Sequence, residues 1–391
     1  MPTAHPPGVT SFPKDEIKVL LLENIHASAS QVFGAEGFKI ETVKSALKED
    51  ELIAKIADVH LLGIRSKTQV TEKALSYAKR LLGLGCFCIG TNQVDLEAAG
   101  KKGVPVFNAP FSNTRSVAEL IMAEIVILAR QVGDRSREVH SGAWKKVAIG
   151  CYEVRGKTLG IIGYGHIGSQ LGVLAEAFGL RVLFFDVATK LPMGNNRSVP
   201  ELKDLLAESD FVTLHVPETP MTKNMFGAAE IAAMKPGAYL LNASRGTVVV
   251  IDALANALKE GRLAGAAVDV FPEEPESNDQ VFTSPLRGLS NVILTPHIGG
   301  STMEAQESIG REVGISLSRF VNTGATPSAV NFPQVEMPQP KGTHRILNVH
   351  RNVPGVLRDI NRIVSELNAN IHAQVLSTDA NIGYLIMDLD Q

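Results

Sequence analysis

Three polar residues in the second half of the chain have the types needed to move a proton and hold an anion at a reacting carbonyl. They are Arg245, Glu274 and His297, and each follows a predicted strand. A carbonyl that accepts a hydride develops negative charge on its oxygen, so it needs a proton donor and a fixed cation nearby. The three types match a base, its orienter and a carboxylate clamp. Because the carboxyl ends of neighbouring parallel strands meet at one edge of a sheet, we expect these side chains to converge on one cleft.

A glycine-rich turn upstream indicates the hydride carrier. Gly163, Gly165 and Gly168 form a glycine-x-glycine-x-x-glycine motif between a predicted strand and a helix, and Asp186 ends the next strand. Gly163 permits a tight turn, Gly165 lets the backbone approach a pyrophosphate, and Gly168 allows close packing of helix on strand. An aspartate at that strand end accepts hydrogen bonds from a ribose hydroxyl and repels a 2′-phosphate, so the motif predicts NAD rather than NADP.

The segment that carries these residues alternates short apolar strands with helical stretches. Six strands with intervening helices form a complete doubly wound domain, the Rossmann architecture of dinucleotide binding. The predicted strands are Thr158–Ile162, Arg181–Asp186, Phe211–Val216, Ala238–Ala243, Ala264–Val270 and Asn291–Pro296.

The first part of the chain shows the same alternation in a weaker form, which predicts a second parallel sheet with helices on its faces. A long amphipathic helix, Ser116–Arg130, with Asn113 or Thr114 as its N-cap, would join the two lobes. The predicted strands of the first lobe are Lys18–Leu22, Val59–Ile64, Leu81–Phe87 and Val104–Ala109.

The C-terminal part reads as a small separate module. An amphipathic helix of about Glu304–Phe320 leads to the proline-rich stretch Asn331–Lys341, which is typical of a linker. The pattern that follows predicts a strand, a helix and two further strands, a βαββ unit. These elements are Arg345–His350, Pro354–Asn368, Ile371–Leu376 and Ile382–Leu389.

Composition and charge exclude some classes of binding partner. The 391 residues carry a net charge of only −3, with no long block of like charge, so neither nucleic acid nor an anionic membrane surface is an expected partner. The chain offers no apolar run long enough to span a bilayer, and its N-terminus lacks the apolar stretch of a secretory signal. The spacing of the cysteines is not that of a metal site, so no bound metal is expected. A cytoplasmic protein is the expectation.

The glycine turn and the segments around Arg245, Glu274 and His297 together resemble the D-isomer-specific 2-hydroxyacid dehydrogenase family over most of the chain. The resemblance implies that His297 donates the proton, that Glu274 keeps it protonatable, and that Arg245 binds the substrate carboxylate and polarises the carbonyl. Formate dehydrogenases of the family have glutamine where Glu274 stands, which disfavours that branch. The residues implied to bind NAD are Gly163, Gly165, His166, Ile167, Gly168, Asp186, Ala243, Ser244, Arg245, Asp269, His297, Gly299 and Gly300.

Within the family, residues 85–93 and 108–116 resemble the bacterial branch that oxidises 3-phospho-D-glycerate at the start of L-serine biosynthesis, and so does the chain from about residue 15. The same resemblance implies a reductive side activity on 2-oxoglutarate. The implied substrate carries a phosphate as well as a carboxylate, so the outer lobe needs cations. The residues expected to bind substrate are Arg65, Ser66, Lys67, Asn113 and Lys146, the last reaching in from a neighbouring subunit.

The tail resembles the ferredoxin-like ACT module, which binds amino acids. The resemblance implies L-serine as an allosteric inhibitor bound across a dimer interface by His350, Asn352 and Asn370. The module of the family is βαββαβ, whereas this sequence ends at Gln391 after βαββ, so the module is expected to be truncated. An uncovered sheet edge and apolar face would favour pairing with another copy.

The predicted protein is therefore α/β, with a Rossmann NAD domain, a flavodoxin-like substrate domain and an ACT-like appendage, assembled as a homodimer or homotetramer. The predicted domains are 1–112 with 303–335 for substrate, 113–302 for NAD, a linker at 336–342, and the module at 343–391. Two alternatives stay open. One is a hydroxypyruvate or glyoxylate reductase of the same family, which needs no phosphate site. The other is a non-catalytic protein that senses NAD.

Overall fold

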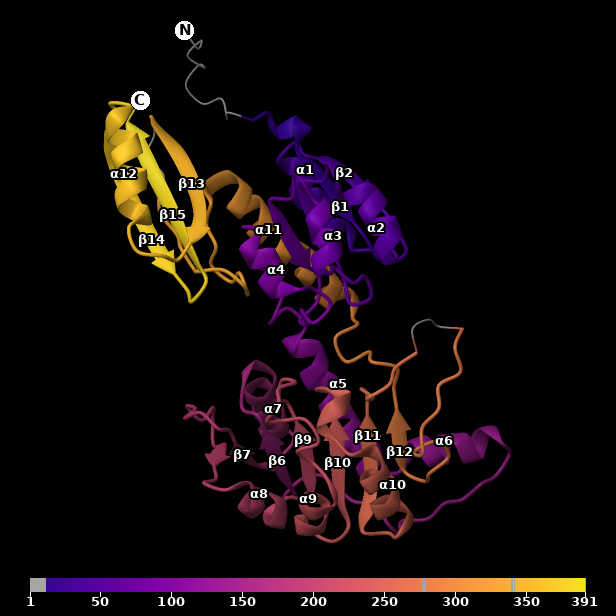
Figure 1. Cartoon of the computed structure of the whole chain (residues 1–391). Coiled ribbons are helices and arrows are strands. Elements are labelled where there is room, and N and C mark those ends of the chain that lie inside the picture. Colours follow the sequence, from indigo (N-terminus) through magenta and orange to yellow (C-terminus); the bar gives the residue numbers. More distant parts are fainter. Residues whose placement is uncertain (1–11, 276–278, 339, 341, 391) are drawn as a thin grey trace. The chain divides into compact units, whose positions relative to one another are not determined.

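The computed structural model describes residues 12–275, 279–338, 340 and 342–390 (Figure 1). The chain divides into two compact units. After the roles that the sequence predicts, we call the described residues before Asn113 and from Gln306 onward the substrate unit, and those of Asn113–Ala305 the NAD unit. Among the described residues, no helix is both long enough and apolar enough to cross a membrane.

The substrate unit is built on a five-stranded parallel sheet with the order β2-β1-β3-β4-β5. Along β1 and the residue that follows it, Val19 and Leu21 face one side, and Leu20 and Leu22 face the other, so both faces are buried. The strands are β1 (Lys18–Leu21), β2 (Lys39–Thr42), β3 (Leu61–Ile64), β4 (Gly83–Cys86) and β5 (Val106–Phe107). The helices are α1 (Ala27–Ala35), α2 (Glu49–Ile56), α3 (Glu72–Tyr77), α4 (Leu96–Lys101) and α11 (Met303–Thr323), after the 3-10 turn η1 (Lys14–Glu16).

The two faces of this sheet have separate cores. Helices α2, α3 and α4 cover one face through residues such as Leu52 and Leu75. Helices α1 and α11 cover the other through residues such as Phe33 and Leu317. The sequence did not predict β2, because this edge strand is mostly exposed and carries no apolar run.

The NAD unit holds a seven-stranded parallel sheet with the order β12-β11-β10-β9-β6-β7-β8. Its strands are β6 (Thr158–Ile162), β7 (Arg181–Phe185), β8 (Arg197–Ser198), β9 (Phe211–Leu214), β10 (Ala238–Asn242), β11 (Leu263–Val268) and β12 (Val292–Leu294). Its helices are α5 (Thr114–Ala129), α6 (Val132–His140), α7 (His166–Ala177), α8 (Leu202–Glu208), α9 (Ala228–Ala233) and α10 (Ile251–Lys259), with the 3-10 turn η2 (Gly246–Val248). The six predicted strands are present within a few residues, and the short edge strand β8 is an addition.

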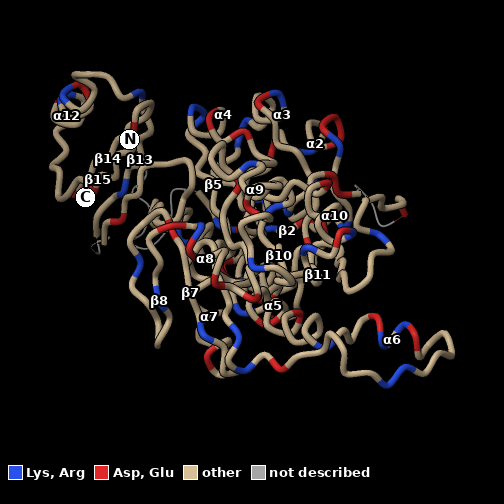
Figure 2. The backbone as a smooth tube through the Cα atoms, turned by 90° about the horizontal axis from the view of Figure 1, so that it is seen from below, with Lys and Arg blue, Asp and Glu red and all other residues tan. Residues whose placement is uncertain are grey.

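Helices α5 and α7 pack on one face of this sheet, and α8, α9 and α10 pack on the other. Helix α5 begins two residues before the predicted start, with Asn113 at its N-cap but with no capping hydrogen bond from that side chain. Helix α6 projects from the body of the unit and carries charges of both signs (Figure 2). Within α6, Arg135 and Glu138 form an ion pair at 2.7 Å.

The C-terminal module has the βαββ pattern that the sequence predicts. An antiparallel sheet of order β13-β15-β14 has α12 on one face. Alternate residues of the central strand face opposite ways: Leu385 and Met387 contact α12, whereas Tyr384 and Ile386 join the core that contains α11. The elements are β13 (Thr343–Arg351), α12 (Val356–Glu366), β14 (Ile371–Thr378) and β15 (Ile382–Asp390).

Within the proline-rich stretch before the module, some residues are packed and others are solvated. Val335 and Met337 are buried in the core of the substrate unit. Arg345 of the module donates to the carbonyl of Met337 at 2.8 Å and pairs with buried Asp388 at 2.6 Å. Residues 339 and 341 of the predicted linker lie outside the described residues.

Candidate active site

The glycine turn after β6 leaves open space where a dinucleotide would need it. Gly163 has a φ of +90°, and a Cβ there would lie 2.4 Å from the carbonyl oxygen of His215. A Cβ on Gly168 would lie 2.4 Å from the carbonyl oxygen of Gly163, whereas one on Gly165 would meet nothing within 4 Å. The first and last glycines are therefore required by packing, and the middle one leaves room at the N-terminus of α7. That end of a helix favours an anion such as a pyrophosphate.

Asp186 lies directly beside this turn. One carboxylate oxygen accepts the backbone N–H of Tyr164 at 2.8 Å, and the other accepts that of Ala188 at 2.9 Å. The aspartate thus fixes the glycine turn to the end of β7 and remains half-buried at the rim. This position fits the ribose contact that the sequence predicts.

The structure brings His297 and Glu274 together. Nδ1 of His297 lies 2.9 Å from Oε2 of Glu274, and Oε1 of that glutamate accepts the N–H of Phe271 at 3.1 Å. His297 has a φ of +55°, unusual for a residue with a side chain, and its N–H donates to the carbonyl of Asp269 at 2.8 Å. Strain of this kind persists where the surroundings hold it in place, as at functional sites.

The pair is electrostatically coupled. The hydrogen bond to Glu274 raises the pKa of His297 against the opposing effect of burial, and the charges of Glu274 and Asp269 act in the same direction as the hydrogen bond. For Glu274, burial alone would raise the pKa, but the contact with His297 and the charge of Arg245 leave it below its usual value. His297 therefore keeps its proton to a higher pH than an isolated histidine.

Asp269 organises the segment that bears the histidine. Its Oδ1 accepts the hydroxyl of Thr295 at 2.6 Å and the N–H of Ile298 at 2.8 Å, and its Oδ2 accepts the N–H of Gly299 at 2.8 Å. A Cβ on Gly299 would lie 3.0 Å from that second oxygen. The carboxylate and the glycine therefore set the path of the chain past His297.

Arg245 lies past the end of β10, half-buried. Its Nη1 donates to the carbonyl of Ser244 at 2.7 Å, and the amide of Asn242 donates to the carbonyl of Arg245 at 3.1 Å. The charge of Arg245 acts on both His297 and Glu274. Together the three supply an imidazole that can carry a proton, its orienting carboxylate and a guanidinium, the set that carbonyl reduction or alcohol oxidation requires.

The predicted substrate residues of the substrate unit follow β3. Arg65 is half-buried, and Ser66 and Lys67 are exposed. Their loop rests on Glu23, a buried residue that the sequence analysis missed because a lone acid after a strand gives no pattern. The loop of exposed Lys44 is tied to the same place, since the N–H groups of Glu23 and Asn24 donate to the carbonyls of Ser45 and Val43.

The remaining predicted substrate residues belong to the NAD unit. Asn113 is buried at the start of α5, where a Cβ on Gly300 would lie 2.3 Å from its Nδ2. Its Oδ1 has no hydrogen-bond partner among the described residues. Lys146 is exposed on the segment between α6 and β6. Among the described residues of its own unit, none links this lysine to the histidine pair.

The three residues predicted to bind serine do not form one site within a single chain. His350 contacts the side chain of Asn348 at 3.0 Å and lies against Gly383, at the start of β15. Asn370 donates to the carboxylate of Asp390 at 2.6 Å, at the far end of the same strand. The amide of Asn352 donates to the carbonyl of Asp379 at 2.7 Å.

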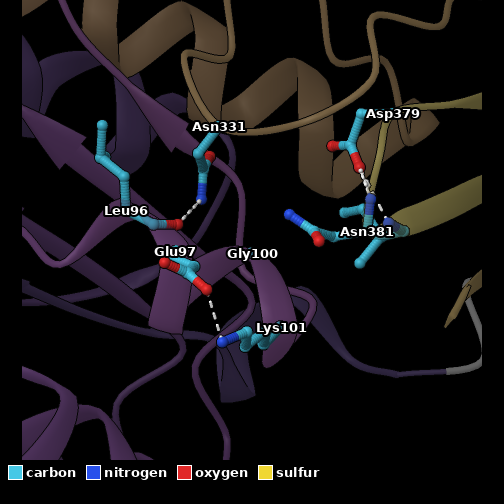
Figure 3. Close-up of a pocket in the computed structure, with 8 residues that line it drawn as sticks. Leu96, Glu97, Gly100, Lys101, Asn331, Asp379 and Asn381 are labelled. Carbon is cyan, nitrogen blue, oxygen red and sulfur yellow. Dashed lines mark hydrogen bonds and ion pairs between the residues drawn. The ribbon is translucent and has the colours of Figure 1, made fainter.

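A small pocket lies between α4 and the turn that joins β14 to β15 (Figure 3). The charged groups on its wall are already paired. Lys101 contacts Glu97 at 2.6 Å, and the carboxylate of Asp379 accepts the N–H groups of Asn381 and Ile382. This pocket belongs to the substrate unit and contains none of the residues predicted for catalysis.

Comparison with known proteins places the chain in a family. Residues 122–299 match the NAD-binding domain of D-isomer-specific 2-hydroxyacid dehydrogenases. The chain is 61% identical over 381 residues to the D-3-phosphoglycerate dehydrogenase of Dictyostelium discoideum, an alignment that covers 97% of this chain and 93% of that one. The chain belongs to the D-isomer-specific 2-hydroxyacid dehydrogenase family. It is an NAD-dependent oxidoreductase, and its cofactor is NAD.

Two further comparisons show the same likeness. The D-3-phosphoglycerate dehydrogenase of Escherichia coli K12 is 55% identical over 381 residues, which cover 97% of this chain and 93% of the relative. A crystal structure of a protein from Thermus thermophilus superposes with a TM-score of 0.73 and 31% identity, covering 80% of this chain and all of that one. The comparisons therefore confirm the family and the cofactor predicted from the sequence.

Proposed function

We propose that the protein is a D-3-phosphoglycerate dehydrogenase, which oxidises 3-phospho-D-glycerate to 3-phosphohydroxypyruvate at the start of L-serine biosynthesis. The observation that carries this proposal is the contact of His297 with Glu274 at 2.9 Å. The charge of Arg245 acts on this pair, and all three residues belong to the unit that contains the glycine turn. Relatives that carry this name match nearly the whole chain at 54–61% identity.

The side chains of the NAD unit account for the proton and the carboxylate. Since Nδ1 of His297 contacts Glu274, Nε2 is left to take the hydroxyl proton of C2 during oxidation and to return it during reduction. Arg245 binds the substrate carboxylate and stabilises negative charge on the reacting oxygen. NAD, when bound, would supply the acceptor for the hydride of C2. Gly165 would leave room for its pyrophosphate, and Asp186 would contact its ribose.

The substrate phosphate is assigned to the cations of the substrate unit. Arg65 and Lys67, with the hydroxyl of Ser66, follow β3 at the carboxyl edge of the parallel sheet, where such sheets bind ligands. Asn113 and the Lys146 of a neighbouring subunit complete the proposed substrate set. Two partly solvated cations favour a phosphate over a neutral group at that end of the substrate.

One comparison of substrates tests the proposal. Initial rates with NADH are measured for 3-phosphohydroxypyruvate, hydroxypyruvate, glyoxylate and 2-oxoglutarate. We expect the highest kcat/KM for the phosphorylated substrate and a smaller side activity on 2-oxoglutarate. Faster turnover of hydroxypyruvate or glyoxylate would identify a reductase of the same family, and NADH binding without turnover would identify a sensor of NAD.

The same assay tests regulation by serine. We propose that His350 and Asn352 of one module and Asn370 of a second copy bind L-serine together, since these residues lie at opposite ends of β15 in one chain. Such a site requires a homodimer or homotetramer. Added L-serine is expected to lower the initial rate, and the His350→Ala variant is expected to lose that inhibition with its uninhibited rate unchanged. A wild-type rate that does not respond to serine would contradict this part of the proposal.

A further inference from the structure

Glu23, two residues after β1, is a buried acid with an unusual backbone. Its exposed fraction is 8%, and both Glu23 and Asn24 have positive φ angles, of +62° and +52°. Residues with side chains rarely adopt this conformation, and two in succession persist only where the surroundings fix them. The chain therefore turns sharply after β1, and this turn places the carboxylate of Glu23 beneath the loop that follows β3.

That carboxylate accepts hydrogen bonds from three of four consecutive residues. Oε1 accepts the N–H of Arg65 at 3.2 Å and that of Thr68 at 2.8 Å, and Oε2 accepts the N–H of Lys67 at 3.0 Å. Hydrogen bonds from backbone N–H groups to a carboxylate are among the stronger ones in proteins. Since these amides point at Glu23, the loop offers a ligand its side chains rather than those three N–H groups.

The peptide of Arg65 is held from its other side as well. Gln93, with an exposed fraction of 3%, donates through Nε2 to the carbonyl of Arg65 at 2.6 Å and to that of Gly90 at 3.2 Å. Thr68 is also buried, and its hydroxyl accepts the N–H of Leu47 at 3.4 Å. Buried polar groups that satisfy one another fix a single arrangement of the backbone.

Glu23 also holds the neighbouring basic loop. Its own N–H donates to the carbonyl of Ser45 at 3.2 Å, and the N–H of Asn24 donates to that of Val43 at 3.4 Å. Lys44 lies between these two acceptors. One buried residue thus ties together two loops that carry three cations, Lys44, Arg65 and Lys67, at the carboxyl edge of one sheet.

We propose that Glu23, assisted by Gln93, is a positioning residue that fixes the basic loops of the substrate unit and thereby gives the enzyme its preference for a phosphorylated substrate. Glu23 does not touch the substrate in this proposal. It acts through the backbone of residues 65–68, so that Arg65 and Lys67 are held for a phosphate before one binds. Preorganised cations bind more tightly because less conformational freedom is lost on binding. This inference rests on the proposed function, since it assigns the phosphate to these loops.

The test uses the full-length Glu23→Gln variant. A carboxamide has one acceptor oxygen, so its NH2 group would face a backbone N–H, and at least one of the three hydrogen bonds is lost. We expect the KM for 3-phosphohydroxypyruvate to rise about tenfold. The kcat, the Kd for NADH and the KM for unphosphorylated hydroxypyruvate are expected to stay at wild-type values. A merely structural role would change all of these together.

Two further variants keep the inference falsifiable. Gln93→Met removes the donor to Arg65 at nearly constant volume and is expected to raise the same KM, whereas Glu23→Asp keeps a carboxylate and is expected to recover part of the loss. The matched control is Glu36→Gln, because Glu36 also accepts a hydrogen bond, from Asn322 at 3.0 Å, but precedes β2 and so lies at the opposite edge of the sheet. This control should match wild type.

The outcomes separate the two proposals. If the wild type does not reduce 3-phosphohydroxypyruvate, the proposed function fails. If the wild type does so but folded Glu23→Gln and Gln93→Met have its KM for both substrates, the positioning role is wrong. A rise in the KM for the unphosphorylated substrate as large as that for the phosphorylated one also contradicts the role.

Discussion

Two glutamates of the NAD unit, Glu274 and Glu124, meet opposite surroundings. Glu274 has partners for both oxygens, His297 and the N–H of Phe271, and its pKa lies below the ordinary value. Glu124, on α5, has an exposed fraction of 2%, and its Oε1 has no hydrogen-bond partner among the described residues. Burial, with a further contribution from the charge of Asp269, raises the pKa of Glu124 to about 8.

The contrast shows how one unit holds a charged and a neutral carboxyl group. The charge of Asp269 raises the pKa of Glu124, and it also raises the pKa of His297, the partner of Glu274. A buried carboxyl without a partner keeps its proton, whereas one paired with an imidazole gives its proton up. The unit therefore contains a Glu274 that stays charged to a lower pH than usual, a His297 that keeps its proton to a higher pH, and a Glu124 that is uncharged near neutral pH.

The largest effect is expected from removing the histidine of the partnered pair. His297→Asn leaves the cofactor turn intact but removes the group that carries the proton, so kcat should fall by about 10⁴-fold. Steady-state rates with NADH and 3-phosphohydroxypyruvate, together with an NADH fluorescence titration, measure the two quantities. The control is His140→Asn, on the projecting helix α6. A His297→Asn enzyme with wild-type kcat would refute the assigned role.

The unpartnered glutamate should control stability instead. The pKa of Glu124 is about 8 in the folded protein and near 4.5 in the unfolded chain, so the folded state binds the proton more tightly. Folding therefore loses stability as pH rises from about 4.5 to 8, and this loss is complete above the folded pKa. Glu124→Gln removes the titration and should stabilise the unit by about 4 kcal/mol at pH 9 and by little at pH 4.

Urea denaturation followed by far-UV circular dichroism at both pH values measures this difference. Glu119→Gln is the matched control, because Glu119 lies on the same helix but is exposed and paired with Arg115. The variant at position 119 should show no such dependence on pH. A Glu124→Gln protein no more stable than wild type at pH 9 would mean that Glu124 is ionised without cost.

Changing the partnered glutamate should move a pH profile. His297 must be protonated for reduction, and its raised pKa keeps the reductive rate high until pH rises through that value. Glu274→Gln removes the contact that raises the pKa, so the fall should come at lower pH, with a loss of about 10²-fold in kcat near neutral pH. Rates of reduction across pH 5–10 reveal the shift, with exposed Glu273→Gln as control. If the pH dependence of the rate is the same in the variant and in wild type, Glu274 does not control the ionisation of His297.

The sequence predicted the partnered group and missed the unpartnered one for a physical reason. Arg245, Glu274 and His297 follow strand ends, and the topology of a doubly wound sheet sends such positions to one edge, so their types and order were informative. Glu124 lies within an apolar helix, where its isolation is visible only in three dimensions. The sequence did not predict a role for Glu23 either, because its partners are backbone N–H groups about 40 residues later in the chain.

The same distinction applies to the fold. Strands buried on both faces, such as β6 and β10, were predicted within a residue or two because their apolar runs are continuous. The edge strands β2 and β8 were missed, since exposed strands carry no apolar pattern. The stretch before the C-terminal module was predicted as a linker from its prolines, but Val335 and Met337 are buried there. Proline content indicates that a segment is locally stiff, but it does not predict whether the segment packs against another part of the protein.

The smallest effect is expected at Asp186, a partnered carboxylate whose charge and hydrogen bonds serve different purposes. Its oxygens hold the N–H groups of Tyr164 and Ala188, and its charge would repel a 2′-phosphate. Asp186→Asn keeps one acceptor oxygen but removes the charge and one of the two backbone hydrogen bonds, so the preference for NADH over NADPH should fall by about tenfold. Asp186→Ala removes the charge and both acceptor oxygens and should also weaken NADH binding. Ratios of kcat/KM for the two cofactors, measured for both variants, separate the effects, and a ratio that Asp186→Asn leaves unchanged would assign the cofactor preference to another residue.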